Sequence, residues 1–336
     1  MSSLPWHEKH FEALIGERAR LPHALLLHGP EGIGKSRFAG SLAQALLCES
    51  AGNSRPCEAC AACGWFGSGN HPDFRLLEPA HPEENEQGEQ QSASKARIRI
   101  VIEQIRELSE FINVSSHRGG FKVILIQPAE ALNLNAANAL LKSLEEPPAG
   151  TFFLLVTHRL HFLLPTLRSR CRHIALPVPQ ANTAAEWLRA QGVAQPELAL
   201  AHTGNAPLLA HELAQRDYWP QRDLFLSRVA VRRFDALAAA EEIADFALRD
   251  IVTWLQKWTF DLVFQRCLGK VRYNPDRAGV IAELSGNIEL LRMLRFHREL
   301  LKLQRVIDHP LNPRLLIEQV LLDYGSAVSS ASGARA

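Results

Sequence analysis

Residues 23–36 of this 336-residue chain read HALLLHGPEGIGKS, and this stretch decides the fold of the first part of the chain. Its first six residues are mostly apolar and are bounded by histidines, as expected of a short strand that is buried on both faces. The strand leads into the pattern G-x-x-x-x-G-K-S at Gly29–Ser36, and the amphipathic pattern of a helix follows over Ser36–Cys48. A strand, a glycine-rich turn and a helix in this order predict a phosphate-binding loop, against the alternative of a plain glycine-rich turn.

Each residue type in this loop has a chemical role. Glycines let backbone N–H groups turn toward a phosphate, and the N-terminus of the following helix adds a favourable dipole. Lys35 is predicted to reach the β- and γ-phosphates of a nucleotide, and Ser36 is predicted to bind Mg²⁺. The predicted nucleotide-binding residues of the loop, with ATP and Mg²⁺ as candidate ligands, are Gly29, Gly32, Gly34, Lys35 and Ser36.

Short apolar runs and helical patterns alternate along the first half of the chain, which predicts an α/β fold. Each run is continuously apolar and is bounded by Gly, Pro or polar residues, as in strands of a parallel sheet that helices cover on both faces. The predicted strands are residues 23–28, 74–78, 122–127, 151–157 and 173–178, and the predicted helices are residues 36–48, 101–114, 136–145 and 162–168. We therefore predict a phosphate-loop domain with a five-stranded parallel sheet.

The pattern changes after the last predicted strand, and this change places the domain boundaries. We predict the α/β domain over residues 1–178, a small domain of short helices over residues 179–218, and a domain of long helices over residues 219–336. Residues 78–95, EPAHPEENEQGEQQSASK, are polar and rich in Gln and Glu, so we expect a solvated loop there. Mimicry of nucleic acid by its glutamates is the alternative to a plain surface loop.

Composition and charge exclude several classes of protein. Hydrophobic residues make up 46% of the chain and charged residues 22%, which is ordinary for a globular protein. Lys and Arg number 37 and Asp and Glu number 36, so the net charge of +1 argues against a globally basic nucleic-acid binder. No apolar run approaches the roughly 20 residues of a membrane span, and the N-terminal stretch lacks the apolar core of a signal peptide. We therefore expect a cytoplasmic protein with no membrane partner.

Four of the six cysteines lie close together in the sequence, at Cys48, Cys57, Cys60 and Cys63. In a reducing compartment, thiolates with the spacing C-x₈-C-x₂-C-x₂-C suit tetrahedral Zn²⁺ better than they suit disulfides. Because four ligands leave no vacant position, the predicted zinc site is structural, and it marks a zinc module at about residues 48–70. Chance clustering is the alternative. The two remaining cysteines, Cys171 and Cys267, are expected to be core thiols.

Hydrolysis by a phosphate-loop enzyme requires acidic residues at the end of a second strand, where they hold Mg²⁺ and activate water. The natural candidate strand, residues 122–126, runs into Gln127, Pro128, Ala129 and Glu130. Gln127 is neutral, Pro128 has no side-chain acceptor, and Glu130 lies too far along the chain to replace either group. The sequence therefore leaves nucleotide binding through Lys35 open and predicts little or no ATP hydrolysis by the isolated chain.

Three further segments carry a resemblance to a known family. They are NALLKSLEEPP at residues 138–148, LVT at residues 155–157 and SRC at residues 169–171. Together with the phosphate loop and the cysteine cluster, they resemble the bacterial clamp-loader proteins of the AAA+ class, strongly over residues 1–215 and only in layout beyond. The resemblance implies an AAA+ domain with a zinc module, a small helical lid, and an all-helical collar for oligomerisation.

Within this family the chain is similar to the stator subunit rather than to the gamma/tau motor subunits. The missing acidic pair supports this assignment, and so does the lack of any counterpart to the long C-terminal extension of tau. By resemblance, Arg170 matches an arginine finger that reaches the γ-phosphate held by a neighbouring subunit, and Thr157 matches a polar sensor in the nucleotide site. The sensor arginine of the lid would fall at Pro207, which carries no charge.

The resemblance also implies partners. They are the gamma/tau and delta subunits in a hetero-pentamer that belongs to the replicative DNA polymerase holoenzyme, with the sliding clamp and primer–template DNA reached through the complex. Two alternatives remain open on the residues. One is a self-sufficient, weak AAA+ ATPase in which Glu130 or Glu145 replaces the missing acid. The other is a structural zinc protein with a vestigial phosphate loop.

Overall fold

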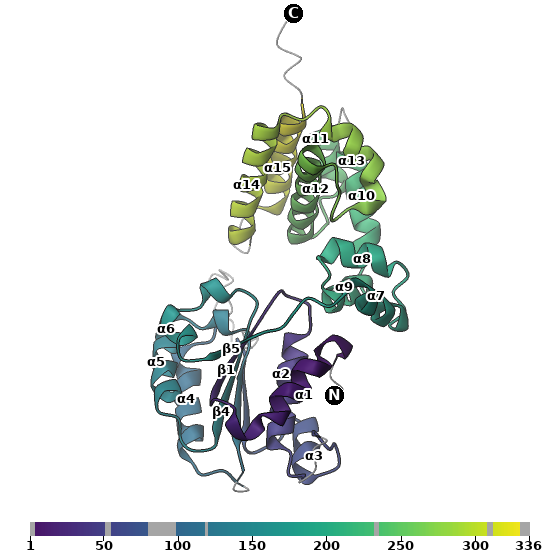
Figure 1. The fold of residues 1–336 in the computed structure, drawn as a ribbon. Coiled ribbons are helices and arrows are strands. Elements are labelled where there is room, and N and C mark those ends of the chain that lie inside the picture. The colour runs from purple at the N-terminus through teal and green to yellow at the C-terminus, as the bar shows by residue number, and fades with distance from the viewer. Residues whose placement is uncertain are drawn as a thin grey trace, which may run out of the picture. The chain divides into compact units, whose positions relative to one another are not determined.

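A parallel sheet of five strands forms the centre of the first of two structural units, as the sequence predicts (Figure 1). The computed structural model describes residues 4–50, 55–79, 99–117, 120–231, 235–307 and 312–329, and the first unit ends at Thr183. The strands, in the spatial order β2-β3-β4-β1-β5, are β1 (Ala24–His28), β2 (Phe74–Leu77), β3 (Lys122–Ile126), β4 (Thr151–Thr157) and β5 (Arg172–Ala175).

Side chains alternate between the two faces of the sheet, and helices cover both faces. From β1, Leu25 and Leu27 join a buried cluster with side chains of α1 (Glu8–Gly16) and α2 (Lys35–Leu47). Leu26 joins the opposite cluster, with side chains of α4 (Ile102–Asn113) and α5 (Leu134–Glu145) (Figure 1). Burial on both faces is the physical reason why the strands are continuously apolar in the sequence.

The strand register places the carboxyl ends of three neighbouring strands at one edge of the sheet. His28, the last residue of β1, pairs with Thr157, the last residue of β4, and β3 lies on the other side of β4. Loops that leave these strands therefore meet at this edge, which is where ligands bind in open α/β sheets. The phosphate loop, residues 127–130 and Thr157 all lie here.

Prolines explain two differences from the predicted elements. The helix predicted over residues 162–168 is divided into η4 (Leu160–Phe162) and α6 (Pro165–Arg168), because Pro165 has no backbone N–H and suits the first turn of a new helix. The strand predicted over residues 173–178 is the shorter β5, which ends before Pro177. The other short elements of this unit are η1 (Pro5–His7), η2 (Arg18–Arg20), α3 (Ala61–Gly67) and η3 (Ala129–Ala131).

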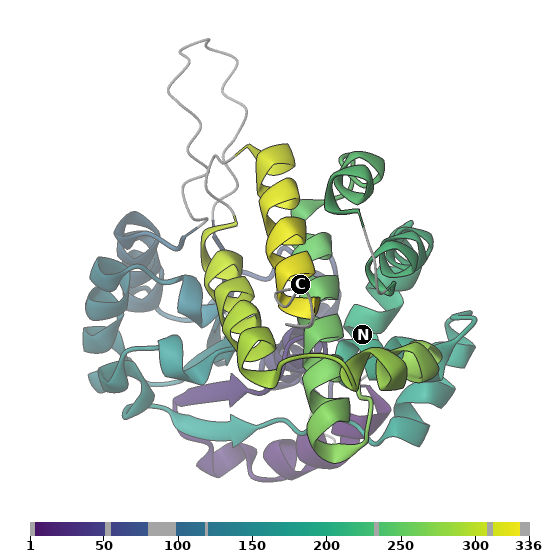
Figure 2. The ribbon, with the colours of Figure 1, turned by 90° about the horizontal axis from the view of Figure 1, so that it is seen from above.

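Helices make up the described part of the second unit, which begins near Ala184. A small buried cluster joins α7 (Ala181–Ala190), α8 (Pro196–Thr203) and α9 (Pro207–Ala214). A larger cluster joins α10 (Tyr218–Val229), α11 (Ala236–Glu242), α12 (Leu248–Leu268), α13 (Ala278–Ser285), α14 (Leu290–Val306) and α15 (Pro313–Val328). Helices α12, α14 and α15 lie side by side (Figure 2). The division of this unit into a lid and a collar at residue 218 stays a prediction.

Two expectations from the sequence concern the chain as a whole. The polar loop expected over residues 78–95 lies outside the described residues, apart from Glu78 and Pro79. No helix in the described ranges is both long enough and apolar enough to cross a bilayer.

A buried polar network orders the connection between α12 and α13, which contains η5 (Pro275–Arg277). The carboxylate of Asp261 is fully buried and accepts hydrogen bonds of 2.8–3.1 Å from three successive backbone N–H groups, those of residues 272–274. The side-chain amide of Asn274 donates a further bond of 2.8 Å to the same carboxylate. The side-chain oxygen of Asn274 accepts a hydrogen bond, also of 2.8 Å, from the buried guanidinium of Arg222 in α10. The network therefore joins α12 to α10 through one turn.

We expect Asp261→Ala to destabilise the second unit by about 3 kcal/mol, because the substitution leaves several buried N–H donors without an acceptor. Urea unfolding of the full chain, followed by tryptophan fluorescence from the second unit, measures the change. Asp245→Ala is the matched control, since Asp245 is exposed in the same unit, and its effect should stay within about 0.5 kcal/mol. Equal unfolding midpoints for the two variants would show that the network contributes nothing to stability.

Candidate functional site

The predicted phosphate loop joins the carboxyl end of β1 to the first turn of α2. At Gly29 a Cβ atom would lie 2.6 Å from the carbonyl oxygen of Leu176, so only glycine lets the loop pass close to the chain that follows β5. Gly34, directly before α2, has a left-handed backbone with φ of +98°. Within the described part of the chain, no side chain caps the N-terminus of α2. Its first backbone N–H groups are therefore available to an anion.

Lys35 lies folded into its own loop. Its side chain is buried, with 2% of the residue exposed, and Nζ donates a hydrogen bond of 2.5 Å to the carbonyl oxygen of Pro30. Burial lowers the pKa of Lys35 to about 8, while the carboxylates of Glu31 and Glu130 raise it. Lys35 therefore remains mostly charged at pH 7. Ser36, the predicted Mg²⁺ ligand, is exposed at the start of α2.

The N-terminal segment packs directly against the phosphate loop, a contact that sequence reasoning missed. Trp6 Nε1 donates a hydrogen bond of 2.8 Å to the carbonyl oxygen of Ile33. His7 is fully buried, with its ring centroid 5.4 Å from that of Phe38 in α2. Burial, followed by the charges of neighbouring bases including Lys35, lowers the pKa of His7 to about 4. His7 is therefore neutral at pH 7 and adds no positive charge to the loop.

The positions of the expected acidic pair carry no carboxylate. The side chain of Gln127 is directed toward the end of the edge strand β2, where Nε2 donates a hydrogen bond of 2.8 Å to Glu78 Oε1. The phosphate loop lies on the other side of β3, beyond β4. Pro128 follows Gln127 and offers no side-chain acceptor. Neither residue can therefore hold Mg²⁺ at the loop.

Glu130 lies closer to the phosphate loop than its place in the sequence suggests. It belongs to η3, which packs against β4 at the same edge of the sheet. Its Oε1 accepts a hydrogen bond of 3.0 Å from the backbone N–H of His158, and its Oε2 is buried without a hydrogen-bond partner in the described part of the chain. His158 directly follows Thr157, which pairs with His28 just before the loop, so the carboxylate of Glu130 lies at the loop's edge of the sheet. Its charge raises the pKa of Lys35.

Thr157 lies where the predicted sensor should lie, at the carboxyl end of β4 beside the loop strand. It is fully buried, and its Oγ1 accepts a hydrogen bond of 3.1 Å from the backbone N–H of Arg159. Its hydroxyl proton is still available to donate. Its role as a sensor stays a prediction.

Arg170 lies away from the phosphate loop, just before the amino end of the edge strand β5. Its Nε donates a hydrogen bond of 2.6 Å to Glu145 Oε1 at the end of α5, and one terminal nitrogen donates to the carbonyl oxygen of Thr166 at 2.9 Å. The Arg170 side chain is 33% exposed. The fold thus brings Arg170 together with Glu145, a pair that sequence reasoning did not foresee. Because the two sites lie at opposite edges of a parallel sheet, Arg170 cannot serve the loop of its own chain.

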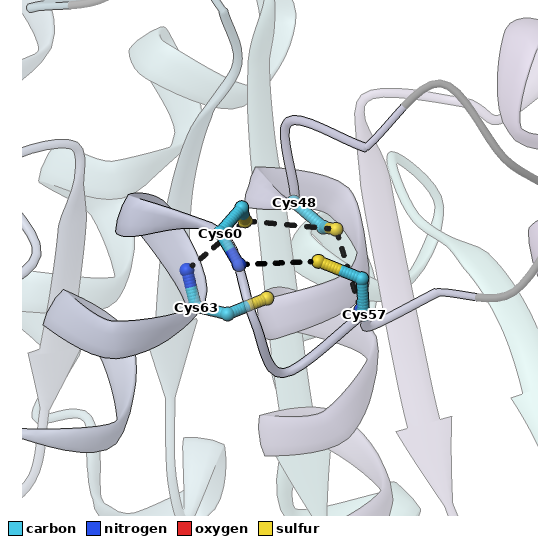
Figure 3. A group of neighbouring side chains, drawn as sticks. All are labelled: Cys48, Cys57, Cys60 and Cys63. Carbon is cyan, nitrogen blue, oxygen red and sulfur yellow. Dashed lines mark hydrogen bonds between the residues drawn. The ribbon is translucent and has the colours of Figure 1, made fainter.

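The four clustered cysteines converge on one point (Figure 3). Their sulfur atoms all lie within 4.8 Å of one another, and the sulfurs of Cys48 and Cys60 are 4.0 Å apart. Cys48 directly follows α2, and Cys60 caps the N-terminus of α3 by accepting from the backbone N–H of Cys63 at 3.4 Å. The end of one helix and the start of another therefore position the ligands.

This geometry suits a tetrahedral metal ion. Four sulfurs at the usual Zn–S distance of about 2.3 Å lie about 3.8 Å from one another, close to the separations observed. Backbone N–H groups of Ala59 and Cys60 lower the pKa of the Cys57 thiol to about 6, which favours the thiolate that a metal needs. Of the two other cysteines, Cys171 is buried as expected, whereas Cys267 is exposed near the end of α12, so its prediction as a core thiol is wrong.

Family models and curated relatives identify the family of this chain. The family model described as "DNA polymerase III, delta subunit" matches residues 7–180. A second model, described as "DNA polymerase III, delta subunit, C terminal", matches residues 216–325. The chain is 35% identical to the DNA polymerase III subunit delta′ of Pseudomonas aeruginosa, with 96% of this chain and 97% of that protein covered. It is 31% identical to the subunit delta′ of Escherichia coli K12, with 95% and 94% covered. A solved structure of a gamma-subunit-related protein from Thermotoga maritima matches at 16% identity and a TM-score of 0.45, with 95% and 99% covered.

Proposed function

The chain belongs to the delta-prime family of bacterial DNA polymerase III subunits, and from this premise we propose that it is the stator of a clamp loader. In this role it assembles with gamma/tau and delta subunits into a hetero-pentamer that places a sliding clamp on primer–template DNA. One observation carries the proposal. The chain keeps its phosphate loop and Arg170, but it has Gln127 and Pro128 where a motor subunit needs two acids.

The position of Arg170 supports a role in trans. Arg170 lies next to β5, the outermost strand, on the side of the sheet where the strands begin. The phosphate loop lies on the opposite side, where the strands end. A guanidinium at an outer strand can enter the site of an adjacent subunit and offset the charge that develops on the transferred phosphate. The stator therefore contributes a rigid shape and one arginine to catalysis by its neighbour.

We also propose Zn²⁺ as the resident metal of the cysteine cluster. Four thiolates are soft ligands, and four-sulfur tetrahedral sites select zinc or iron–sulfur chemistry. The site joins α2, which carries the phosphate loop at its other end, to α3. A metal held there orders the segment around α3 and takes no part in a reaction, because no ligand position is open.

A second candidate function, a weak self-sufficient ATPase, is favoured by one observation. Glu130 has a buried carboxylate oxygen without a partner in the described residues, and its charge acts on Lys35. A carboxylate in this place could hold Mg²⁺ or orient water. The two functions differ in whether the isolated chain turns over ATP.

We expect the purified chain to bind nucleotide but to show no ATP turnover above the background of a Lys35→Ala control, because residues 127 and 128 cannot complete a metal site. Release of phosphate from ATP, measured with and without primed DNA, tests this expectation.

Addition of gamma/tau and delta subunits to the same chain should produce a DNA-stimulated ATPase. Under the stator proposal, Lys35→Ala in this chain should change the rate of the complex little. Robust hydrolysis by the pure chain that Lys35→Ala abolishes would contradict the stator proposal and support the ATPase.

A further inference from the structure

Two opposite charges beside the phosphate loop each lack a full set of partners. Lys35 Nζ makes one hydrogen bond within the described residues, to Pro30, although an ammonium group can donate three. Glu130 Oε2 is buried and accepts none there. Each group carries what the other needs, and both lie at the carboxyl edge formed by β1, β4 and β3.

We propose that Glu130 is the internal counter-ion of Lys35 and competes with the phosphates of a nucleotide for the loop. The inference concerns the nucleotide affinity of the chain, so it stands whether or not the chain acts as a stator. The two side chains form no direct ion pair in the described structure, but Glu130 is bonded to the N–H of His158, next to the end of the strand that precedes the loop. A carboxylate there partly offsets the charge of Lys35 and lowers the affinity of the loop for a second anion. It also repels the phosphates themselves, because like charges interact strongly where water is excluded.

Among the described residues, Arg159 is the other cation near His158, and its guanidinium lies over the ring of Phe162, 5.5 Å from the centroid. Three histidines lie close enough to Lys35 to feel its charge, namely His7, His28 and His158. Burial lowers the pKa of each of them, so all three are neutral near pH 7. These histidines therefore add no positive charge to that of Lys35 and the N-terminus of α2.

Two carboxylates raise the pKa of Lys35, and they differ in exposure. Glu31 lies on the loop itself and acts more strongly on Lys35 in the observed geometry, but its side chain is exposed. An exposed carboxylate can turn into solvent when phosphate arrives, and water and salt screen its charge. Glu130 is fixed by its bond to the N–H of His158 and cannot withdraw in this way. The carboxylate that is fixed in place should therefore control the affinity.

Glu130→Gln is the direct test, because glutamine keeps the shape of the side chain and an oxygen that can accept from His158. We expect this variant of the full chain to bind fluorescent ADP and ATP analogues about tenfold more tightly than the natural chain, both in Mg²⁺ and in EDTA. Glu31→Gln is the matched control and should change the affinity less than threefold, whereas Lys35→Ala should abolish binding. An unchanged thermal unfolding midpoint would show that the variants are folded.

Each other outcome overturns the proposal in a recognisable way. Weaker binding by Glu130→Gln in Mg²⁺ alone would make Glu130 a metal ligand, as the ATPase alternative requires. Equal increases in nucleotide affinity in Glu31→Gln and Glu130→Gln would show that the total charge near the loop sets the affinity. Unchanged affinity, or no binding by Glu130→Gln at millimolar nucleotide, would show that no competition exists. None of these results bears on Arg170, so failure here and failure of the stator proposal remain distinguishable.

Discussion

Replacement of Arg170 with alanine should lower the DNA-stimulated ATPase of a reconstituted clamp loader and slow the loading of the clamp. An arginine supplied in trans contributes roughly 10³–10⁵-fold at its own catalytic site. Because other subunit interfaces keep their own fingers, we expect the overall rate to fall by roughly two- to tenfold rather than to vanish. Phosphate release, measured at saturating ATP and primed DNA, gives the ratio of the ATPase rates of complexes that contain the natural chain or Arg170→Ala.

The contacts of Arg170 make the experiment selective. Its partners, Glu145 and Thr166, lie on the surface of its own chain, and the side chain is one-third exposed. Loss of one exposed ion pair costs about 1 kcal/mol or less, so the variant should fold, keep its metal and assemble. A change in rate would therefore report on the neighbouring site and not on stability.

Arg172→Ala is the matched control, since Arg172 is also exposed and forms an ion pair with Glu17 at 3.4 Å. It should leave the rate of the complex unchanged. Lys35→Ala, measured beside it, should have little effect. If Arg170→Ala is silent and Lys35→Ala severe, the roles that we assign to the two residues are reversed.

Removal of one cysteine ligand should empty the metal centre. We expect one Zn²⁺ per natural chain by elemental analysis, and roughly none in Cys60→Ser, because structural zinc sites depend on all four ligands. Serine retains a capping oxygen for α3, so the loss would report on the metal rather than on the helix cap. Residues 55–67 should then become sensitive to limited proteolysis, and the remaining thiols of the cluster should react freely.

Cys267→Ser controls for a change of thiol at a distance from the cluster, since Cys267 is exposed in the second unit. It should retain one Zn²⁺ and the natural pattern of proteolysis. A natural chain that contains no metal and whose four clustered thiols titrate freely would exclude the zinc centre.

Features that depend on local chemistry could be predicted from the amino-acid sequence alone. The pattern from His23 to Ser36 predicts the strand, the loop and the helix that the structure contains, because glycines at fixed spacing are needed only where backbone turns closely around a ligand. The spacing of the four cysteines predicts their convergence for a similar reason, since short intervals limit how far apart the ligands can lie. The absence of acidic residues at positions 127 and 128, which are Gln and Pro, can be read directly from the sequence.

Contacts between side chains that are distant in the sequence could be found only in the folded structure. Glu130 acts on Lys35 because η3 packs on β4 and two neighbouring strands end at the same edge of the sheet. Arg170 pairs with Glu145 because α5 runs back to the amino edge where β5 begins. No pattern in the sequence encodes such contacts, since they join segments that are brought together by burial of apolar strand faces, a force without direction. The electrostatic state of the phosphate loop therefore depends on the packing of the whole sheet.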